Sequence, residues 1–256
     1  MPVALAVPAA LGLIFLVLPL VGLLARTPWD TLPQRLAAPG VLTALRLSVQ
    51  SATLATLLCL ALGVPLAWLL ARARFPGRRI VRALVTVPLV LPPVVGGVAL
   101  LLVFGRRGLL GQWLDSTFGV TLPFTTTGVV LAEAFVAMPF LVIAVEGALR
   151  GADSRYEEAA ATLGAGRWTT FTQVTLPLIA PGVAAGTVLC WARALGEFGA
   201  TITFAGNYPG RTQTMPLAVY LALETDLEAA IVLSLVLLTV SVAILAGLRD
   251  RWIGSP

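Results

Sequence analysis

The chain has 256 residues and a formal net charge of +5, and 58% of its residues are hydrophobic while only 11% are charged. This balance lies outside the range of soluble globular domains and indicates a multispanning membrane protein. Every basic residue is arginine, histidine is absent, and Cys59 and Cys190 lie inside apolar runs, which leaves no disulfide framework, zinc cluster or histidine base.

A membrane-spanning helix needs about 20 apolar residues, and six stretches of the chain are long enough. They are predicted at residues 3–24, 44–71, 81–104, 128–149, 182–204 and 227–248. The first has no basic residue before it and is too long for the apolar part of a signal peptide, so we expect a retained span. The predicted fold is an all-α membrane protein with six transmembrane helices.

Helix-breaking residues interrupt the third predicted span. The run 92–97 contains Pro92, Pro93, Gly96 and Gly97. Each proline removes a backbone hydrogen bond, which in hydrocarbon must be replaced by neighbouring groups or by water. Two interpretations remain open: a kink that only shapes helix packing, or a kink that lines a translocation path.

Residues 151–181 lie between two membrane-length segments and must form structure in water. Ser154 with Glu157 three residues later is typical of a capping box at the start of a short helix, and Gly164 and Gly166 supply backbone freedom for a turn.

A second amphipathic segment follows this turn. Its apolar residues are Trp168, Phe171 and Val174, and it is predicted to end at Pro177 and Pro181. The prediction is a helix-turn-helix at the membrane surface; on this pattern alone, an ordinary surface hairpin is the simpler explanation.

The predicted spans 128–149 and 182–204 contain the charged residues Glu133, Glu146, Arg193 and Glu197. A charge at the bilayer centre costs roughly 2.5–3.5 kcal/mol on insertion scales, so each is expected to face a partner or water. Glu146 is close enough to the membrane edge to reach the headgroups. Arg193 and Glu197 are one helical turn apart and are placed to pair. We interpret the pair as a structural clamp, with contact between Arg193 and a passing anion as the alternative.

The arginines are divided unequally between the two predicted sides of the membrane. Ten lie on the side that holds connector 72–80, the 151–181 hairpin and the C-terminus, and six lie on the other side. Because cytoplasmic loops carry the excess of positive charge, the hairpin and both termini are predicted to be cytoplasmic. Topology therefore explains the positive charge better than nucleic-acid binding does.

The hairpin resembles the EAA loop of ABC importer permeases, which follows the pattern E-A-A-x3-G-x9-I-x-L-P. The matching residues are Glu158, Ala159, Ala160, Gly164, Val174 in place of the commoner isoleucine, Leu176 and Pro177. The resemblance implies a type I ABC importer permease fold, with a first helix and external loop at 1–42, a transmembrane domain at 43–249 and a cytoplasmic tail at 250–256. The 151–181 loop would insert into a groove of a cytoplasmic ATP-hydrolysing subunit.

The same resemblance implies roles for individual residues of the hairpin. Gly164 would permit the turn, and Glu158 would fix the geometry of the hairpin through a hydrogen bond or an ion pair. Ala159, Ala160 and Leu163 would form the surface pressed against the ATPase.

Four further stretches are similar to the molybdate permease group: 88–95 (PLVLPPVV), 192–201 (ARALGEFGAT), 205–207 (AGN) and 211–218 (RTQTMPLA). Related sulfate permeases tend to have tyrosine where Phe198 stands. The resemblance covers about residues 42–248 and implies an importer of molybdate, and of tungstate, in a bacterial or archaeal plasma membrane. Its candidate path or gate residues are Pro92, Pro93, Gly96, Arg193, Glu197 and Thr201.

The resemblance also implies partners: a second copy of this chain, two cytoplasmic ATP-binding subunits and an external oxyanion-binding protein. The chain has no G-x-x-x-x-G-K-S/T loop and no lysine to serve one, so ATP and magnesium are expected in the partner subunit. No catalytic residue, metal ligand or cofactor is expected in this chain. The alternatives are a sulfate or thiosulfate permease and an ATP-independent secondary anion transporter, although no internal repeat supports the latter.

Overall fold

The computed structural model describes residues 3–252, and these residues form helices joined by turns and loops. Five helical segments are long and apolar enough to cross a membrane, and a bent pair of helices makes a sixth. The five are α1 (Val3–Ala25), α3 (Pro39–Arg72), α7 (Thr126–Gly151), α13 (Leu227–Trp252), and the continuous run of α9 (Arg167–Thr170), the π-helical turn η1 (Phe171–Thr175) and α10 (Leu176–Leu195). The predicted all-α membrane fold is confirmed.

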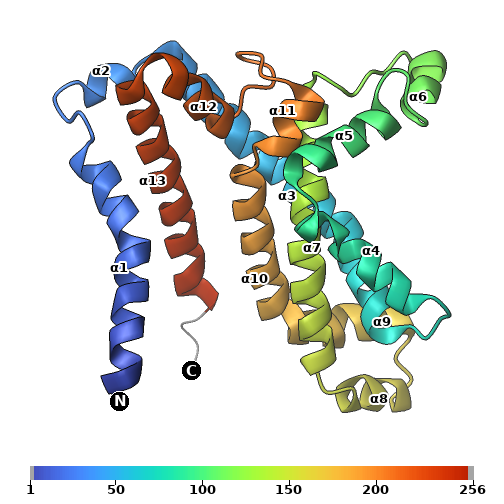
Figure 1. The fold of residues 1–256 in the computed structure, drawn as a ribbon. Helices are drawn as coiled ribbons and strands as arrows, with labels where there is room; N and C mark the ends of the chain where they lie inside the picture. Colours follow the sequence, from blue (N-terminus) through green and yellow to red (C-terminus); the bar gives the residue numbers. More distant parts are fainter. Residues whose placement is uncertain (1–2, 253–256) are drawn as a thin grey trace.

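The shorter helices lie at the two ends of the bundle or near its middle. They are α2 (Leu32–Leu36), α6 (Gly111–Phe118), α8 (Arg155–Thr162), α11 (Gly199–Ala205) and α12 (Met215–Thr225). Figure 1 shows α8 at the same end as the start of α1 and the end of α13, while α2, α6 and α12 lie at the opposite end. We call the end that holds α8 the hairpin end. Residues 253–256 of the predicted tail lie outside the described residues.

The third predicted span, 81–104, is not one helix. It consists of α4 (Arg78–Val90) and α5 (Pro93–Phe104), which meet at an angle of 118°. The backbone at Leu91 is extended because the residue before a proline is disfavoured in the helical conformation, and the second proline removes another donor. The expected kink is therefore a break between two helices.

The fifth predicted span, 182–204, has the wrong boundaries at both ends. The helix begins at Arg167 and ends at Leu195, and α11 follows as a separate element. Pro177 was expected to end the hairpin segment, since an interior proline clashes with the preceding turn. The π turn widens the backbone immediately before this proline, and the helix continues into the membrane.

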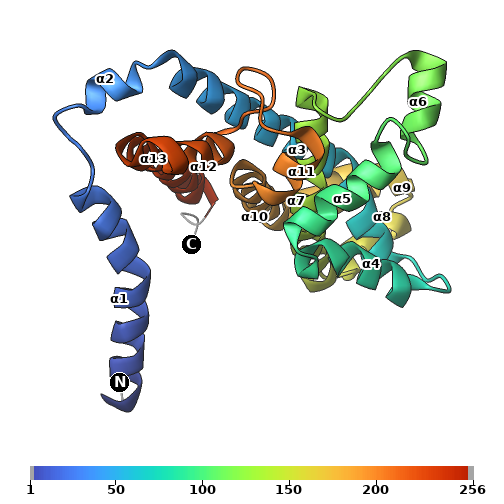
Figure 2. The same cartoon turned by 45° about the horizontal axis from the view of Figure 1, so that its top comes forward.

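The core of the bundle is α7, which packs between α3 and α10. Its apolar side chains face small residues on both neighbours. A methyl group placed on Gly186 of α10 would lie 2.9 Å from the Cβ atom of Ala144, so the missing side chain allows the two helices to lie close together. Helix α1 lies apart from this core (Figure 2) and contacts α13. Most of its apolar side chains are exposed.

An ion-pair cluster at the end opposite the hairpin fixes α2 to the start of α13. The Arg35 guanidinium contacts Asp226 Oδ2 at 2.8 Å and Glu228 Oε2 at 2.6 Å. The hydrogen bond from Arg35, followed by that from the Ala229 backbone, holds the pKa of Asp226 below its usual value. The same carboxylates raise the pKa of Arg35, chiefly through its hydrogen bond to Asp226.

Candidate functional site

Two breaks in the membrane-spanning helices meet inside the bundle. The break between α4 and α5 lies against the break between α10 and α11, so that Pro93 faces Gly199. A Cβ atom at Gly199 would lie 2.8 Å from the Pro93 Cβ atom, and one at Gly97 would lie 2.9 Å from the Ala200 carbonyl oxygen. Glycine at both positions therefore allows α5 to cross α11 in direct backbone contact.

The Arg193–Glu197 pair joins the two sides of the second break. Arg193 Nη2 lies 2.6 Å from Glu197 Oε2, and the side chains are 27% and 1% exposed. The other carboxylate oxygen, Oε1, accepts the backbone N–H of Ala200 at 2.8 Å. Arg193 belongs to the last turn of α10 and Ala200 to the first turn of α11, so one carboxylate spans the gap between two helices. A negative charge is also favourable at a helix N-terminus.

An open hollow of about 290 Å³ lies beside this pair. It is lined by Pro93, Val94, Arg193, Gly196, Glu197, Phe198 and Gly199. A guanidinium has five N–H donors, and Nη2 of Arg193 makes the contact with Glu197. The arrangement therefore places a partly exposed cation on the wall of the hollow.

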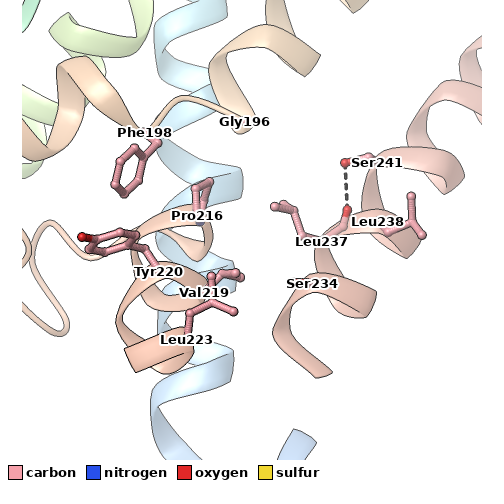
Figure 3. A pocket seen from close by; sticks show the side chains of 10 residues that line it. All are labelled: Gly196, Phe198, Pro216, Val219, Tyr220, Leu223, Ser234, Leu237, Leu238 and Ser241. Carbon is pink, nitrogen blue, oxygen red and sulfur yellow. Dashed lines mark hydrogen bonds between the residues drawn. The ribbon is translucent and has the colours of Figure 1, made fainter. Parts of the chain in front are cut away.

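A larger apolar hollow adjoins the first. Its volume is about 540 Å³, and it lies between α12 and α13, beside Gly196 and Phe198, which line both hollows. Figure 3 shows Phe198 and Tyr220 on one side and Leu237 and Ser241 on the other. The rings of Phe198 and Tyr220 are in contact, with centroids 5.1 Å apart. Tyr220 was not predicted as a site residue, because it lies in a connector where no helix was expected.

The remaining predicted path residues lie around the breaks in different environments. Pro92 caps the start of α5, and Gly96 is buried against the ring of Phe135. Thr201 is fully buried, does not line the hollow beside Arg193, and has no hydrogen-bond partner for its hydroxyl among the described residues. Gly96 and Thr201 therefore lie inside the bundle near the breaks, whereas Pro92 is exposed.

The two carboxylates of α7 are both buried and both have partners. Glu133 Oε1 accepts the Ser51 hydroxyl at 2.8 Å. Glu146 was expected to reach the lipid headgroups, but its Oε1 atom accepts Arg82 Nη2 at 2.7 Å and pairs with Arg150 Nη2 at 2.8 Å. The headgroup interpretation is wrong because α4 places Arg82 directly against this side chain.

The hairpin 151–181 contains α8 and α9, joined by a turn at Gly164, whose φ of +82° is a left-handed conformation that suits glycine. The expected capping box is not formed. The first backbone N–H of α8, that of Arg155, donates to Asp153 Oδ1 at 2.9 Å. The Ser154 hydroxyl donates to Glu158 Oε1 at 3.3 Å. The side chain of Glu157 turns away from the cap toward α3.

The predicted hairpin surface is open to solvent. Leu163 is 89% exposed at the tip of the hairpin, and Ala159 is exposed on the same helix, with Ala160 half-buried. Further along, Val174 is half-buried, while Leu176 and Pro177 are exposed. Exposed large apolar side chains on the hairpin are typical of a surface that contacts another protein or a membrane.

Comparison with known proteins gives three results. Residues 63–255 match the family described as the binding-protein-dependent transport system inner membrane component. The chain is 50% identical over 244 residues to the molybdenum transport system permease protein ModB of Mycobacterium tuberculosis, covering 95% of this chain and 92% of that protein. It is 38% identical over 236 residues to the sulfate transport system permease protein CysT of Escherichia coli, covering 91% and 85%.

The fold has a counterpart among solved structures. A chain of the bacterial alginate ABC transporter, solved in complex with its alginate pentasaccharide-bound periplasmic protein, superposes with a TM-score of 0.78 at 20% identity. The match covers 98% of this chain and 93% of that one. At this identity the likeness concerns the fold alone.

Proposed function

Because this chain belongs to the family of binding-protein-dependent transport system inner membrane components, we propose that it is the permease subunit of an ATP-driven importer for molybdate. One observation carries the substrate: identity to a molybdenum permease is 50% over nearly the whole of both chains, against 38% for a sulfate permease. Tungstate, which has the same charge and tetrahedral shape, is expected to share the path. Sulfate is the second candidate, supported by the substantial identity to the sulfate protein.

The permease works with separate subunits in this proposal. Two copies of the chain form the pathway, two cytoplasmic subunits bind ATP and magnesium, and an external protein delivers the oxyanion. The lack of lysine and of a phosphate-binding loop supports the placement of ATP hydrolysis in another subunit. The family description, which names transport that depends on a binding protein, supports the external partner.

The hairpin is the proposed contact with the ATP-hydrolysing subunit. Leu163 at its tip is exposed and apolar, so it can be buried in such a contact. The hairpin end is proposed to face the cytoplasm, since most arginines of the chain lie on that side. Closure of the two ATPase subunits would draw the two hairpins together, and the spans would alternate between inward and outward openings.

The hollow beside Arg193 is proposed to lie on the translocation path, and the Arg193–Glu197 pair is proposed to hold the break in shape. The hydrogen bond from the Ala200 backbone to Glu197 supports the clamp, because the same carboxylate then contacts both α10, through Arg193, and α11. Because Glu197 balances its charge, the partly exposed Arg193 would make transient contact with an anion but would not hold it tightly. Weak binding suits a pathway from which the ion must leave.

Reconstitution tests the proposal directly. The purified chain and its ATPase partner are placed in vesicles with the binding protein, and uptake of labelled molybdate, tungstate and sulfate is measured with and without ATP. Molybdate and tungstate uptake that requires ATP is the expected result. Preferential sulfate uptake would select the second candidate, and uptake by the chain alone without ATP would indicate a secondary transporter.

A further inference from the structure

A single carboxylate oxygen joins three elements at the hairpin end. Glu157 Oε1 accepts Arg72 Nη2 at 2.9 Å and the Thr175 hydroxyl at 3.1 Å. Arg72 is the last residue of α3, and Thr175 is the last residue of η1, directly before α10. Glu157 itself lies in the first turn of α8. The hairpin is thus bonded to the ends of two core helices through one side chain.

The contact is sheltered from water. The side chains of Arg72 and Glu157 are 22% and 26% exposed, and Thr175 is buried. Solvent and salt screen such a pair less than a pair on an open surface. The neighbouring Glu158, which carries the same chemistry, is exposed and accepts a side-chain hydrogen bond only from Ser154 among the described residues.

The Arg72–Glu157 pair has an unused second contact. Arginine and a carboxylate can form two parallel hydrogen bonds, but only Nη2 of Arg72 reaches Glu157. Arg72 Nε is buried and has no hydrogen-bond partner within residues 3–252. Nε belongs to the same guanidinium as Nη2, so it is available to the Glu157 carboxylate if α8 moves relative to α3.

The end of α3 is bonded to other spans as well. Arg78 and Arg82 of α4 donate to the carbonyl oxygens of Ala71 and Leu70, at 3.2 and 3.3 Å. These carbonyls are among those that a helix C-terminus leaves without an internal partner. Arg82 also pairs with Glu146 of α7. A displacement of α3 is consequently passed to α4 and α7.

We propose that Glu157 is the positioning residue that transmits movement of the hairpin to α3 and α10, by closing its pair with Arg72 while it holds Thr175. This inference rests on the proposed function, because it takes the hairpin to be moved by the ATPase subunit. Residues 158–164 supply the contact surface with that subunit, and Glu157 supplies the connection to the spans.

The test uses the complete transporter in vesicles and compares wild type with Glu157→Gln. Glutamine keeps the shape of the side chain but loses the ion pair. Anion uptake and ATP hydrolysis are measured on the same preparation, and the amount of assembled complex is measured by co-purification. We expect normal assembly and continued ATP hydrolysis, but about a fivefold fall in molybdate transported per ATP, the scale of one partly exposed ion pair.

The matched control is Glu228→Gln, which removes one carboxylate from an arginine pair at the opposite end of the molecule. Its ratio of transport to hydrolysis is expected to equal that of wild type. An unchanged ratio in Glu157→Gln, or a loss confined to the amount of assembled complex, would overturn the proposal. The exchanged pair, Arg72→Glu with Glu157→Arg, is expected to recover part of the ratio.

A second variant, Thr175→Val, removes the hydroxyl and keeps the shape of the side chain, and it tests the proposal if Glu157→Gln does not assemble. It is expected to lower the ratio of transport to ATP hydrolysis, and a wild-type ratio in this variant would overturn the proposal. The proposed function fails separately: it fails if the wild-type complex itself shows no ATP-dependent molybdate uptake. Normal wild-type uptake with an unchanged ratio in the variants would remove only the role of Glu157.

Discussion

At the scale of single residues, Glu197 holds together two helices that the backbone separates. Its two oxygen atoms bond the Arg193 side chain and the Ala200 N–H, on opposite sides of the break. The two charged partners differ in exposure, since Glu197 is fully buried while Arg193 reaches the hollow. A buried charge without a partner costs more than one that reaches water, so the two residues are not equivalent.

Substitution of these residues by methionine tests the difference. Arg193→Met leaves Glu197 buried and unpaired, and is expected to destabilise the protein by about 3 kcal/mol. Glu197→Met is expected to cost less, and the double variant is expected to be more stable than Arg193→Met. Thermal unfolding of the purified variants in detergent gives the order. If the double variant assembles and hydrolyses ATP but no longer transports molybdate, Arg193 acts on the anion and the clamp is wrong.

The Arg35 cluster predicts a pH dependence at the other end of the molecule. The pKa of Asp226 is lowered in the folded state, chiefly by Arg35, so the contribution of this pair is present above the unfolded value of about 3.9 and is lost as pH falls through the folded pKa. The difference in melting temperature between wild type and Arg35→Gln should therefore shrink below about pH 4. A difference that is constant from pH 7 to pH 3 would contradict this assignment.

At the scale of elements, α5 and α11 cross where side chains are missing. Gly97 and Gly199 face backbone or rigid atoms of the opposite element, so neither position has a flexible neighbour that can move aside. Protein interiors respond to added volume with strain and not with smooth expansion. The crossing therefore fixes the relative placement of the two breaks, and with it the hollow beside Arg193.

Gly199→Ala is predicted to destabilise the protein by about 1–3 kcal/mol, because its methyl group would overlap the Pro93 ring. The matched control is Gly147→Ala in α7, where an added Cβ atom meets nothing within 4 Å. Helix propensity alone favours alanine there by about 1 kcal/mol. Equal melting temperatures for the two variants would show that the crossing is not tightly packed.

Gly164→Val tests the turn of the hairpin. A β-branched residue at φ +82° is strained by about 1–3 kcal/mol, so the hairpin is expected to change shape, and transport to become uncoupled from ATP hydrolysis or the complex to fail to assemble. The control is Gly166→Ala, where φ is −68° and the space around the Cα atom is open. Normal uptake by Gly164→Val would count heavily against a coupling role for this loop.

The sequence predicted the spans best where a long apolar run alone defines them. The run at 128–149 became α7 (Thr126–Gly151) with an error of two residues at each end. The prolines at 92 and 93 signalled an interruption, but its angle depends on packing against α11, which spacing does not reveal. The Ser154–Glu157 pattern failed for a similar reason: Arg72, 85 residues away, bonds Glu157 in place of the local cap.

At the scale of the whole molecule, the two ends of the bundle differ in their contacts. The hairpin end gathers ion pairs among α3, α4, α7 and α8, whereas at the opposite end the Arg35 cluster joins only α2 and the start of α13. Many bonds among helix ends make one end of the bundle act as a unit. That end also presents the exposed hairpin, as expected of the face that meets a motor subunit.

Chemical labelling tests which end faces the cytoplasm. Leu163→Cys places a thiol on the hairpin, and Ser116→Cys places one on α6 at the opposite end; both positions are exposed, while Cys59 and Cys190 are buried. A maleimide that cannot cross membranes should label Ser116→Cys in intact cells, and Leu163→Cys only after the membrane is opened. Labelling in the reverse order would place the hairpin outside and end the proposal.

The continuous helical run from Arg167 to Leu195 joins parts that the sequence divides into a surface segment and a span, and it changes direction between α9 and α10 (Figure 1). The 20 residues of α10 correspond to a rod about 30 Å long. A tilt of roughly 10° about its base would carry its far end through about 5 Å, roughly half the spacing of neighbouring helices. Because Arg193 lies at that far end, a small movement of the hairpin would be enlarged beside the proposed path.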